Sequence, residues 1–466
     1  MALRFGTDGV RGVANTELTP EVVLALGRAA ARVLGGPALV VGRDTRRSGP
    51  LLSAALAAGV AAEGVDVIDL GVVPTPAVAF ASEDMGVAGA VVSASHNPFP
   101  DNGVKLFGSG GRKPGPELER RLEAEVASLL DGPGGGTTPP PAGAGVGAIA
   151  ADRAVVARYS EHLVSSLEGR RLEGLRVVVD CGNGAASAIA PQVLRELGAG
   201  VEVINDQPDG TNINSGCGST DLSGLREAVR AAGADAGIAF DGDADRVLAV
   251  DNEGEVVDGD RILALCAGDL HQRGRLRGDT VVVTVMANLG LWQAMAEQAI
   301  NVHETPVGDR HVLEALEAGG WSLGGEQSGH LVFRDLATTG DGILTAIQVL
   351  DLVRRRGRPL AELAGAAMRR VPQVLHNVEV ADRDVLTRSR AVQEELAAVR
   401  AELGDSGRVL LRPSGTEPLV RVMVEAPTEE EARAAAQRLT RAVLRADGAA
   451  APQGEDRLSG PKQSDH

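Results

Sequence analysis

The chain has 466 residues, 44% of them hydrophobic, and a formal net charge of −17. The length exceeds what one hydrophobic core usually accommodates, so we expect several domains, and the acidic balance excludes nucleic acid and anionic membranes as partners. Its apolar runs are shorter than the roughly 18 residues of a membrane span. Its three cysteines form no CxxC pair, and this cysteine pattern predicts a reduced, cytoplasmic location and no zinc site.

The first predicted unit is a β-branched run followed by a loop and a helical stretch, ALVVGRDTRRSGPLLSAALAAGV (38–60). A second strand-like run follows, and a third, AVV (90–92), leads into the polar cluster SASHNP. Strands that alternate with helices favour largely parallel α/β sheets. Ligands bind such sheets beyond the carboxyl ends of the strands, so we expect this cluster at the edge of a site.

Ser95 stands in this cluster beside His96, and Lys105 follows in the same stretch. Ser95 could cap a following helix, act as a hydrolase nucleophile or accept a phosphoryl group. A hydrolase nucleophile needs a Gly-Xaa-Ser-Xaa-Gly elbow, which Ala94 and His96 do not provide. A phospho-acceptor fits best if an acidic metal site lies elsewhere in the chain. Lys105 is one of only three lysines, and since Lys can release a proton where Arg cannot, it is a candidate proton-transfer group.

The Pro- and Gly-rich stretch DGPGGGTTPPPAGAGVGAIA (131–150) predicts a linker or surface loop without regular structure. Beyond it, the pattern of strand, loop and helix recurs at LRVVVDCGNGAASAIAPQVLREL (175–197) and again at DTVVVTVMANLGLWQAMAEQ (279–298). Three copies of one pattern predict three similarly folded α/β domains.

The second unit ends in FDGDADR, where Asp241, Asp243 and Asp245 alternate after an apolar run. In a looped backbone, alternate carboxylates can converge on one hard cation; a solvated acidic loop is the alternative. An EF-hand is excluded, because Arg246 and Asn252 stand where it needs Gly and Glu.

Three carboxylates would leave a Mg²⁺ ion open to another oxygen, which a phosphorylated Ser95 could supply. Such a site needs cations, for which the candidates are Arg11, Lys105 and Arg246.

The third unit ends in GGEQSGH, in which Glu326, Ser328 and His330 alternate with small residues. Carboxylate and hydroxyl groups in this spacing suit a polyol edge. His330 is either a structural histidine or a proton-transfer group.

The last segment reads as a smaller α+β module. RPSGTEPLVR joins strand-like runs and is either an ordinary turn or an anion-binding nest made by Arg412, Ser414, Gly415, Thr416 and Arg421. An amphipathic helix follows, with a capping box at Thr428 and Glu431. The polar tail, 447–466, is predicted to be disordered.

Five motifs together resemble the α-D-phosphohexomutase family: FGTDGVRG (5–12), SASHNPFPDNGVKLF (93–107), DGDADR (241–246), GEQSGH (325–330) and RPSGTEPLVRVMVE (412–425). The resemblance spans the chain to about residue 446. It implies three similar α/β domains, with mixed, largely parallel sheets flanked by helices, and a smaller C-terminal α+β domain, all around a central cleft. The expected domains are 1–150 with a phosphoserine loop, 151–252 with a metal loop, 253–370 with a sugar-binding loop and 371–446 with a phosphate-binding loop.

The resemblance also implies roles for single residues. Ser95 would be the phosphoserine, and its phosphate would bind Mg²⁺ together with Asp241, Asp243 and Asp245. Glu326 and Ser328 would contact sugar hydroxyls. The distal phosphate would be bound by Arg412, Ser414, Gly415, Thr416 and Arg421. Proton transfer and charge stabilisation would be carried out by Arg11, His96, Lys105, Arg246 and His330.

The implied reaction interconverts glucosamine 6-phosphate and glucosamine 1-phosphate through a hexosamine 1,6-bisphosphate, which also serves as activator. Gln327 favours the glucosamine branch of the family. The alternatives are a phosphomannomutase/phosphoglucomutase and a non-catalytic phosphosugar-binding paralogue. The implied partners are a small phosphosugar, a phosphoryl donor that activates Ser95 and, as an option, a second copy of the chain in a homodimer.

Overall fold

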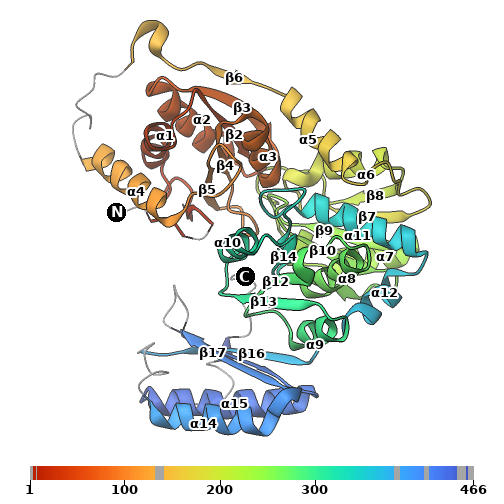
Figure 1. Ribbon diagram of the computed structural model, residues 1–466. Coiled ribbons are helices and arrows are strands. Elements are labelled where there is room, and N and C mark those ends of the chain that lie inside the picture. The colour runs from red at the N-terminus through yellow and green to blue at the C-terminus, as the bar shows by residue number, and fades with distance from the viewer. Residues whose placement is uncertain are drawn as a thin grey trace. The chain divides into compact units, whose positions relative to one another are not determined.

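The structure is a computed structural model that describes residues 4–6, 8–131, 141–381, 389–413 and 419–448, and the backbone of 458–459. The chain divides into two compact units (Figure 1). Unit 1 comprises Met1–Met286 and Gln298–Ala367, and unit 2 comprises Ala287–Glu297 and Met368–His466.

The described part of unit 1 contains three β-sheets with one strand pattern. In each sheet a central strand, β2, β7 or β12, pairs in parallel with the next two strands of the chain, one on either side. The strand after those pairs antiparallel with the second of the two. This confirms three similar α/β domains with mixed sheets. The strands are β1 (Val10–Val13), β2 (Ala38–Arg43), β3 (Asp66–Val72), β4 (Ala88–Val92), β5 (Asp101–Phe107) and β6 (Ile149–Ala151); β7 (Arg176–Asp180), β8 (Gly200–Ile204), β9 (Ala236–Phe240), β10 (Val247–Asp251) and β11 (Val256–Val257); β12 (Thr280–Thr284), β13 (Asn301–Thr305), β14 (Leu323–Gly325) and β15 (Leu331–Phe333).

Small aliphatic residues build the cores of these sheets, since aromatic residues make up only 2% of the chain. Strands β4, β9 and β12 are buried at every position, as expected for parallel strands that are covered on both faces. The α-helices in the described part of unit 1 are α1 (Pro20–Leu34), α2 (Gly49–Ala62), α3 (Thr75–Met85), α4 (Pro116–Asp131), α5 (Ala154–Ser165), α6 (Ala190–Glu196), α7 (Ser223–Ala232), α8 (Gly259–Gln272), α10 (Asp309–Gly319), α11 (Gly342–Arg356) and α12 (Leu360–Ala367).

Unit 2 has an antiparallel sheet in the order β17-β18-β16-β19, which confirms the smaller α+β module. Helices α14 and α15 lie side by side on this sheet (Figure 1), and the predicted capping box of Thr428 and Glu431 is confirmed at the start of α15. The elements are α9 (Leu289–Glu297), β16 (Gln373–Glu379), α14 (Arg390–Leu403), β17 (Arg408–Pro413), β18 (Leu419–Glu425), α15 (Glu429–Ala446) and β19 (Leu458–Ser459).

The Pro- and Gly-rich stretch departs from its prediction at its end. Ile149 and Ala150 belong to β6, which pairs in parallel with β3 at the sheet edge, because this short apolar run can complete the hydrogen bonds of an edge strand. Residues 132–140 lie outside the described residues. The predicted disorder of 447–466 also concerns residues that mostly lie outside them.

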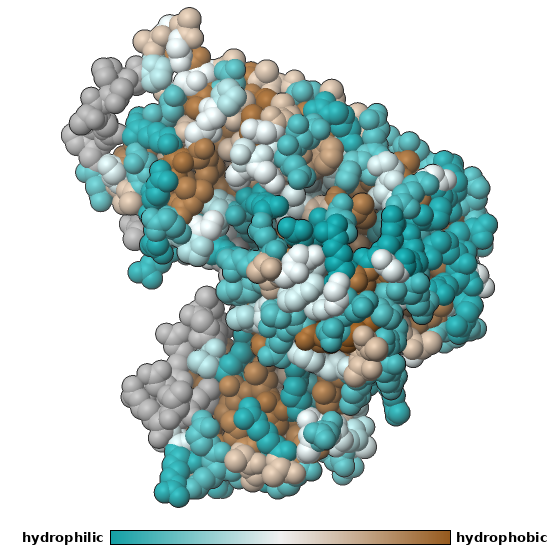
Figure 2. Space-filling view, in the orientation of Figure 1, coloured by the Kyte–Doolittle hydropathy of each residue, from teal (hydrophilic) through white to brown (hydrophobic). Residues whose placement is uncertain are grey.

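Few large apolar side chains are exposed among the described residues, and the face in Figure 2 is mostly hydrophilic. Within the described part of the chain, no helix combines the length and the apolar character that crossing a bilayer requires. Cys181, Cys217 and Cys266 are all buried and free.

Candidate phosphoryl-transfer site

The three polar clusters of unit 1 occupy corresponding positions in its three sheets. Residues 93–100 join β4 to β5, residues 241–246 join β9 to β10, and residues 326–330 join β14 to β15. Each loop therefore leaves the carboxyl end of the third parallel strand and turns back into the antiparallel fourth strand. The contacts within unit 1 bring residues of all three loops together.

Ser95 is buried and has a left-handed backbone, with φ of 52°. Its Oγ donates a hydrogen bond to Asp241 Oδ2 at 2.5 Å and lies 3.4 Å from His96 Nδ1. The next regular element is β5 and not a helix, so Ser95 is no helix cap. The geometry favours a hydroxyl that is aimed at the acidic loop.

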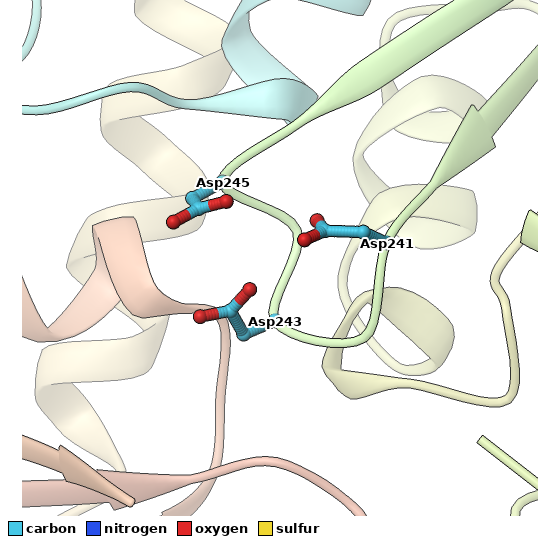
Figure 3. Close-up of side chains that lie close together, drawn as sticks. All are labelled: Asp241, Asp243 and Asp245. Carbon is cyan, nitrogen blue, oxygen red and sulfur yellow. The ribbon is translucent and has the colours of Figure 1, made fainter. Parts of the chain in front are cut away.

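Asp241, Asp243 and Asp245 point toward one another from a single loop (Figure 3). All three are buried, and one carboxylate oxygen of each lies within 4.8 Å of the others. Gly242 allows the close approach to Ser95, because a Cβ at this position would lie 2.6 Å from the Ser95 carbonyl oxygen. The sequence prediction of converging carboxylates is confirmed.

The donor set fits a hard metal ion. Asp243 Oδ1 is buried and accepts no hydrogen bond from the described residues. Burial raises the pKa of Asp241 well above its ordinary value, and the neighbouring charges of Asp245 and Asp243 raise it further. Mg²⁺ and Ca²⁺ prefer carboxylate oxygens as ligands, and a divalent cation would offset the repulsion between these three. The three aspartates can therefore hold a metal ion.

Lys105 reaches the same carboxylates from β5. Its buried Nζ donates to Asp243 Oδ2 at 2.8 Å and to Asp245 Oδ2 at 2.7 Å. Burial opposes the charge on the amine, but Asp243, Asp245 and Asp8 outweigh it and raise the pKa of Lys105. This geometry favours a permanent cation and not a group that releases its proton.

The other predicted cations contact the metal loop, residues 241–246, and the serine loop, residues 93–100. The Arg246 backbone N–H donates to Asp241 Oδ1 at 3.2 Å, and Arg246 Nε lies 3.9 Å from Asp245 Oδ1. Arg11 donates to Asp8 Oδ2 at 3.0 Å and to Asn97 Oδ1 at 3.4 Å.

His96 is a weak base in these surroundings. Burial lowers the pKa of His96 to about 3, and the charges of Arg246 and Arg11 add to the effect. Near neutral pH its imidazole is therefore uncharged, so it can accept a hydrogen bond from a hydroxyl but does not readily hold a second proton.

His330 lies between two carboxylates. Its Nδ1 is 3.7 Å from Asp245 Oδ1 and its Nε2 is 3.7 Å from Asp309 Oδ2. Burial lowers the pKa of His330, but Asp245 and Asp309 outweigh this and raise it overall. This environment favours a proton-transfer group over a purely structural histidine.

Sequence reasoning missed a chain of charges beside His330. Lys113 Nζ contacts Asp309 Oδ2 and lies 3.2 Å from Asp8 Oδ1; the side chains of Lys113 and Asp309 are largely shielded from water, and that of Asp8 is partly exposed. The scarcity of lysine in this chain was the only signal that pointed to Lys113. Thr75 was also missed: its Oγ1 donates to Asp243 Oδ2 at 2.6 Å.

Glu326 and Ser328 lie on the same loop as His330. Glu326 is buried and its Oε1 accepts a hydrogen bond from the Gly308 N–H at 3.1 Å, while burial raises the pKa of its carboxyl. Ser328 Oγ is shielded from water and forms no hydrogen bond with the described residues. The Ser328 hydroxyl therefore retains hydrogen-bonding capacity, and the sugar-binding role of both residues stays a prediction.

The predicted anion nest lies in unit 2. Arg412 on β17 and Arg421 on β18 are directly opposite each other in the antiparallel pair. Ser414, Gly415 and Thr416 lie outside the described residues, so their predicted role stays a prediction.

The chain matches the four domain models of one family, described as phosphoglucomutase/phosphomannomutase. Its α/β/α domains I, II and III match residues 2–131, 157–254 and 258–371, and its C-terminal domain matches residues 375–442. The four matches follow the order of the chain and cover most of it.

Individual relatives agree with these matches. The chain is 55% identical to a phosphoglucosamine mutase of Symbiobacterium thermophilum over 432 residues, which is 91% of this chain and 95% of that protein. It is also 55% identical to a phosphoglucosamine mutase of Frankia alni, over 96% of this chain and 99% of that protein. Among solved structures, a phosphoglucomutase/phosphomannomutase family protein of Burkholderia thailandensis has a TM-score of 0.79 at 28% identity, covering 95% of this chain and 97% of its own.

Proposed function

The chain belongs to the phosphoglucomutase/phosphomannomutase family, and on this premise we propose that it is an isomerase that interconverts glucosamine 6-phosphate and glucosamine 1-phosphate. The hydrogen bond from Ser95 Oγ to Asp241 Oδ2 carries the proposal, because it joins a phosphoryl acceptor to a metal-binding carboxylate. The relatives named phosphoglucosamine mutase support an amino sugar as the substrate.

The reaction has two phosphoryl transfers. Phosphorylated Ser95 gives its phosphoryl group to the free hydroxyl of the sugar phosphate, so that the P–O bond to Ser95 breaks as a P–O bond to the sugar forms. The resulting 1,6-bisphosphate reorients, and its other phosphate returns to Ser95. Positioning and charge stabilisation account for most of the catalysis in such transfers.

The residues around Ser95 supply that stabilisation. Lys105, Arg246 and Arg11 provide positive charge to the transferring group, and His330 exchanges the proton of the sugar hydroxyl. Neutral His96 orients Ser95 Oγ. Asp241, Asp243 and Asp245 would hold Mg²⁺ together with an oxygen of phosphorylated Ser95, and bound Mg²⁺ would offset the negative charge of the phosphoryl group.

The substrate is held by polar groups that suit either orientation. Glu326 and Ser328 bind sugar hydroxyls. The role predicted for Arg412, Ser414, Gly415, Thr416 and Arg421 of unit 2, binding of the phosphate that is not transferred, stays a prediction. Guanidinium groups bind phosphate with paired hydrogen bonds, so they can accept the phosphate at carbon 1 or at carbon 6.

Assays with glucosamine, glucose and mannose phosphates, side by side, test the substrate. We expect kcat/KM to be highest for glucosamine 6-phosphate. A higher value for glucose or mannose phosphate would instead identify a phosphomannomutase/phosphoglucomutase. Binding of phosphosugars without turnover by protein that already carries phosphate on Ser95 would identify a non-catalytic paralogue.

Replacing Ser95 by Ala should abolish turnover, because the variant has no oxygen to carry the phosphoryl group. Mass spectrometry of the wild-type protein in the presence of a hexosamine 1,6-bisphosphate should find phosphate on Ser95. The matched control is Ser187→Ala, which removes a hydroxyl that, among the described residues, bonds only to the Gly184 carbonyl. Substantial turnover by the Ser95 variant would contradict the mechanism.

The proposal includes a donor that first phosphorylates Ser95, for which the bisphosphate is the simplest candidate. Homodimer formation stays a prediction, which the mass of the protein in solution tests.

A further inference from the structure

We propose that Arg46 is a positioning residue for phosphoryl transfer, which holds Ser95 in the conformation that aims its hydroxyl at the aspartates. The inference rests on the proposed function, because it assigns Arg46 a task in transfer through Ser95. Arg46 lies in the loop that follows β2, in the stretch GRDTRRSG, and its side chain is fully buried.

The Arg46 guanidinium binds backbone carbonyls of the loop that carries Ser95 and of the first residue of β5. Its Nη2 donates to the carbonyl oxygens of Ser95 and Asn97, both at 2.8 Å. Its Nη1 donates to the carbonyl oxygens of Pro98 at 2.5 Å and Asp101 at 3.1 Å. A planar fork with several fixed donors can span these acceptors, whereas the single ammonium of a lysine cannot.

A second path leads from Arg46 to the amide of Ser95. Arg46 Nε donates to Asp44 Oδ2 at 2.8 Å, and the same oxygen accepts a hydrogen bond from Ser93 Oγ at 2.6 Å. Ser93 Oγ in turn accepts the Ser95 N–H at 2.9 Å. Arg46 therefore binds the Ser95 carbonyl directly and is linked to the Ser95 amide through Asp44 and Ser93.

This double hold explains how Ser95 keeps an unfavourable backbone. A non-glycine residue at φ of 52° is uncommon and persists where surrounding contacts enforce it. Asn214 Nδ2 adds a further hydrogen bond to the Ser95 carbonyl at 2.9 Å. In this conformation Ser95 Oγ reaches Asp241, so loss of the hold displaces the reacting oxygen.

Arg46 is not among the residues that we propose to bind the substrate, so its loss should affect the transfer step more than binding. We expect Arg46→Lys to lower kcat about 100-fold, a typical effect of a misplacement of about 1 Å, and to change KM less than about threefold. The fraction of Ser95 that is phosphorylated by glucosamine 1,6-bisphosphate in a fixed time should fall in parallel. Arg47→Lys is the matched control, because Arg47 is the exposed neighbour in the same loop, and it should behave as the wild type.

The two proposals fail in different ways. A folded Arg46→Lys variant with kcat within about twofold of an active wild type, or with a raised KM alone, overturns the positioning role. A wild type without activity on hexose phosphates overturns the proposed function instead. If Arg46→Lys does not fold, Ser93→Ala replaces it as the test, because it removes one hydroxyl from the second path. A fall in kcat of about tenfold with unchanged KM in Ser93→Ala supports the inference, and an unchanged kcat overturns it.

Discussion

At the scale of single residues, the candidate site concentrates opposite charges where water is excluded. Asp241, Asp243 and Asp245 come from one loop. Lys105 lies on β5, and its ammonium contacts Asp243 and Asp245. Removing one partner of a buried charge pair is costly, because the other charge is left without compensation. Lys105 therefore offsets the charge of the same aspartates that could hold a metal ion.

Replacing Lys105 by Met, which keeps the length of the side chain without its charge, should have two opposite effects. Mg²⁺ should bind more tightly, because a positive charge beside Asp243 and Asp245 has been removed. Turnover should fall at least about 100-fold, because the transferring phosphoryl group loses a fixed cation. Calorimetric titration of unphosphorylated protein with Mg²⁺ measures the first effect, and kcat at saturating Mg²⁺ measures the second.

Lys462→Met is the control for this experiment, since Lys462 belongs to the tail outside the described residues and outside every motif. It should leave both quantities unchanged. An unaltered affinity of Lys105→Met for Mg²⁺ would speak against a metal site on the three aspartates.

At the scale of elements, the start of α11 connects several parts of unit 1. Asp341 caps this helix by accepting the Leu344 N–H at 2.9 Å, and it also accepts the Tyr159 hydroxyl of α5 at 2.9 Å. The next residue, Gly342, donates its N–H to the Ala244 carbonyl in the metal loop at 3.0 Å. The helix start thus supports the loop that carries the three aspartates.

Asp341 predicts a pH dependence of stability. Burial raises the pKa of Asp341 to about 6, although the hydrogen bonds from Leu344 and Tyr159 lower it. The folded protein therefore binds this proton more tightly than the unfolded chain, so stability falls as pH rises from about 4 to about 6. Asp341→Asn stays neutral throughout and keeps an oxygen that can cap the helix.

The wild type should consequently lose up to about 3 kcal/mol of stability relative to Asp341→Asn over this pH window. Thermal denaturation of both proteins at several pH values measures the difference. Asp335→Asn, at a nearby exposed carboxylate, serves as the control. A difference between wild type and Asp341→Asn that does not change with pH would contradict the predicted titration.

At the scale of the whole molecule, the chain forms two compact units with separate cores. The core of unit 2 consists of aliphatic residues from β16, β18, α14 and α15, among them the fully buried Val422. The two tryptophans of the chain are divided between the units, with Trp321 in unit 1 and Trp292 in unit 2. Each can therefore report on the unfolding of its own unit.

Replacing Val422 by Ala should destabilise unit 2 by roughly 2 kcal/mol, because it leaves a cavity in that core. In a Trp321→Phe background, the urea midpoint of Trp292 fluorescence should fall. In a Trp292→Phe background, the midpoint of Trp321 fluorescence should stay the same. Val250→Ala, in a core of unit 1, should give the reverse result. Equal shifts of both midpoints in either variant would show that the units unfold as one.

Sequence patterns and their local chemistry predicted much of this protein. The three repeated α/β units, the smaller α+β module and the capping box of Thr428 and Glu431 were predicted, since periodicity and capping depend on neighbouring residues. The convergence of Asp241, Asp243 and Asp245 was predicted for the same reason. Ile149 and Ala150 were wrongly assigned to irregular structure, because their strand exists only through pairing with β3.

The sequence by itself thus determined the family, the kinds of domain and the residue types available for chemistry. Only the tertiary structure decided which charges meet: Lys105 with Asp243 and Asp245, His330 between Asp245 and Asp309, and Arg46 beneath the Ser95 loop. These partners are far apart in the chain, and their meeting depends on the order of strands in the sheets and on how the sheets pack. The burial that shifts the pKa of His96 and Asp341 arises from that packing as well.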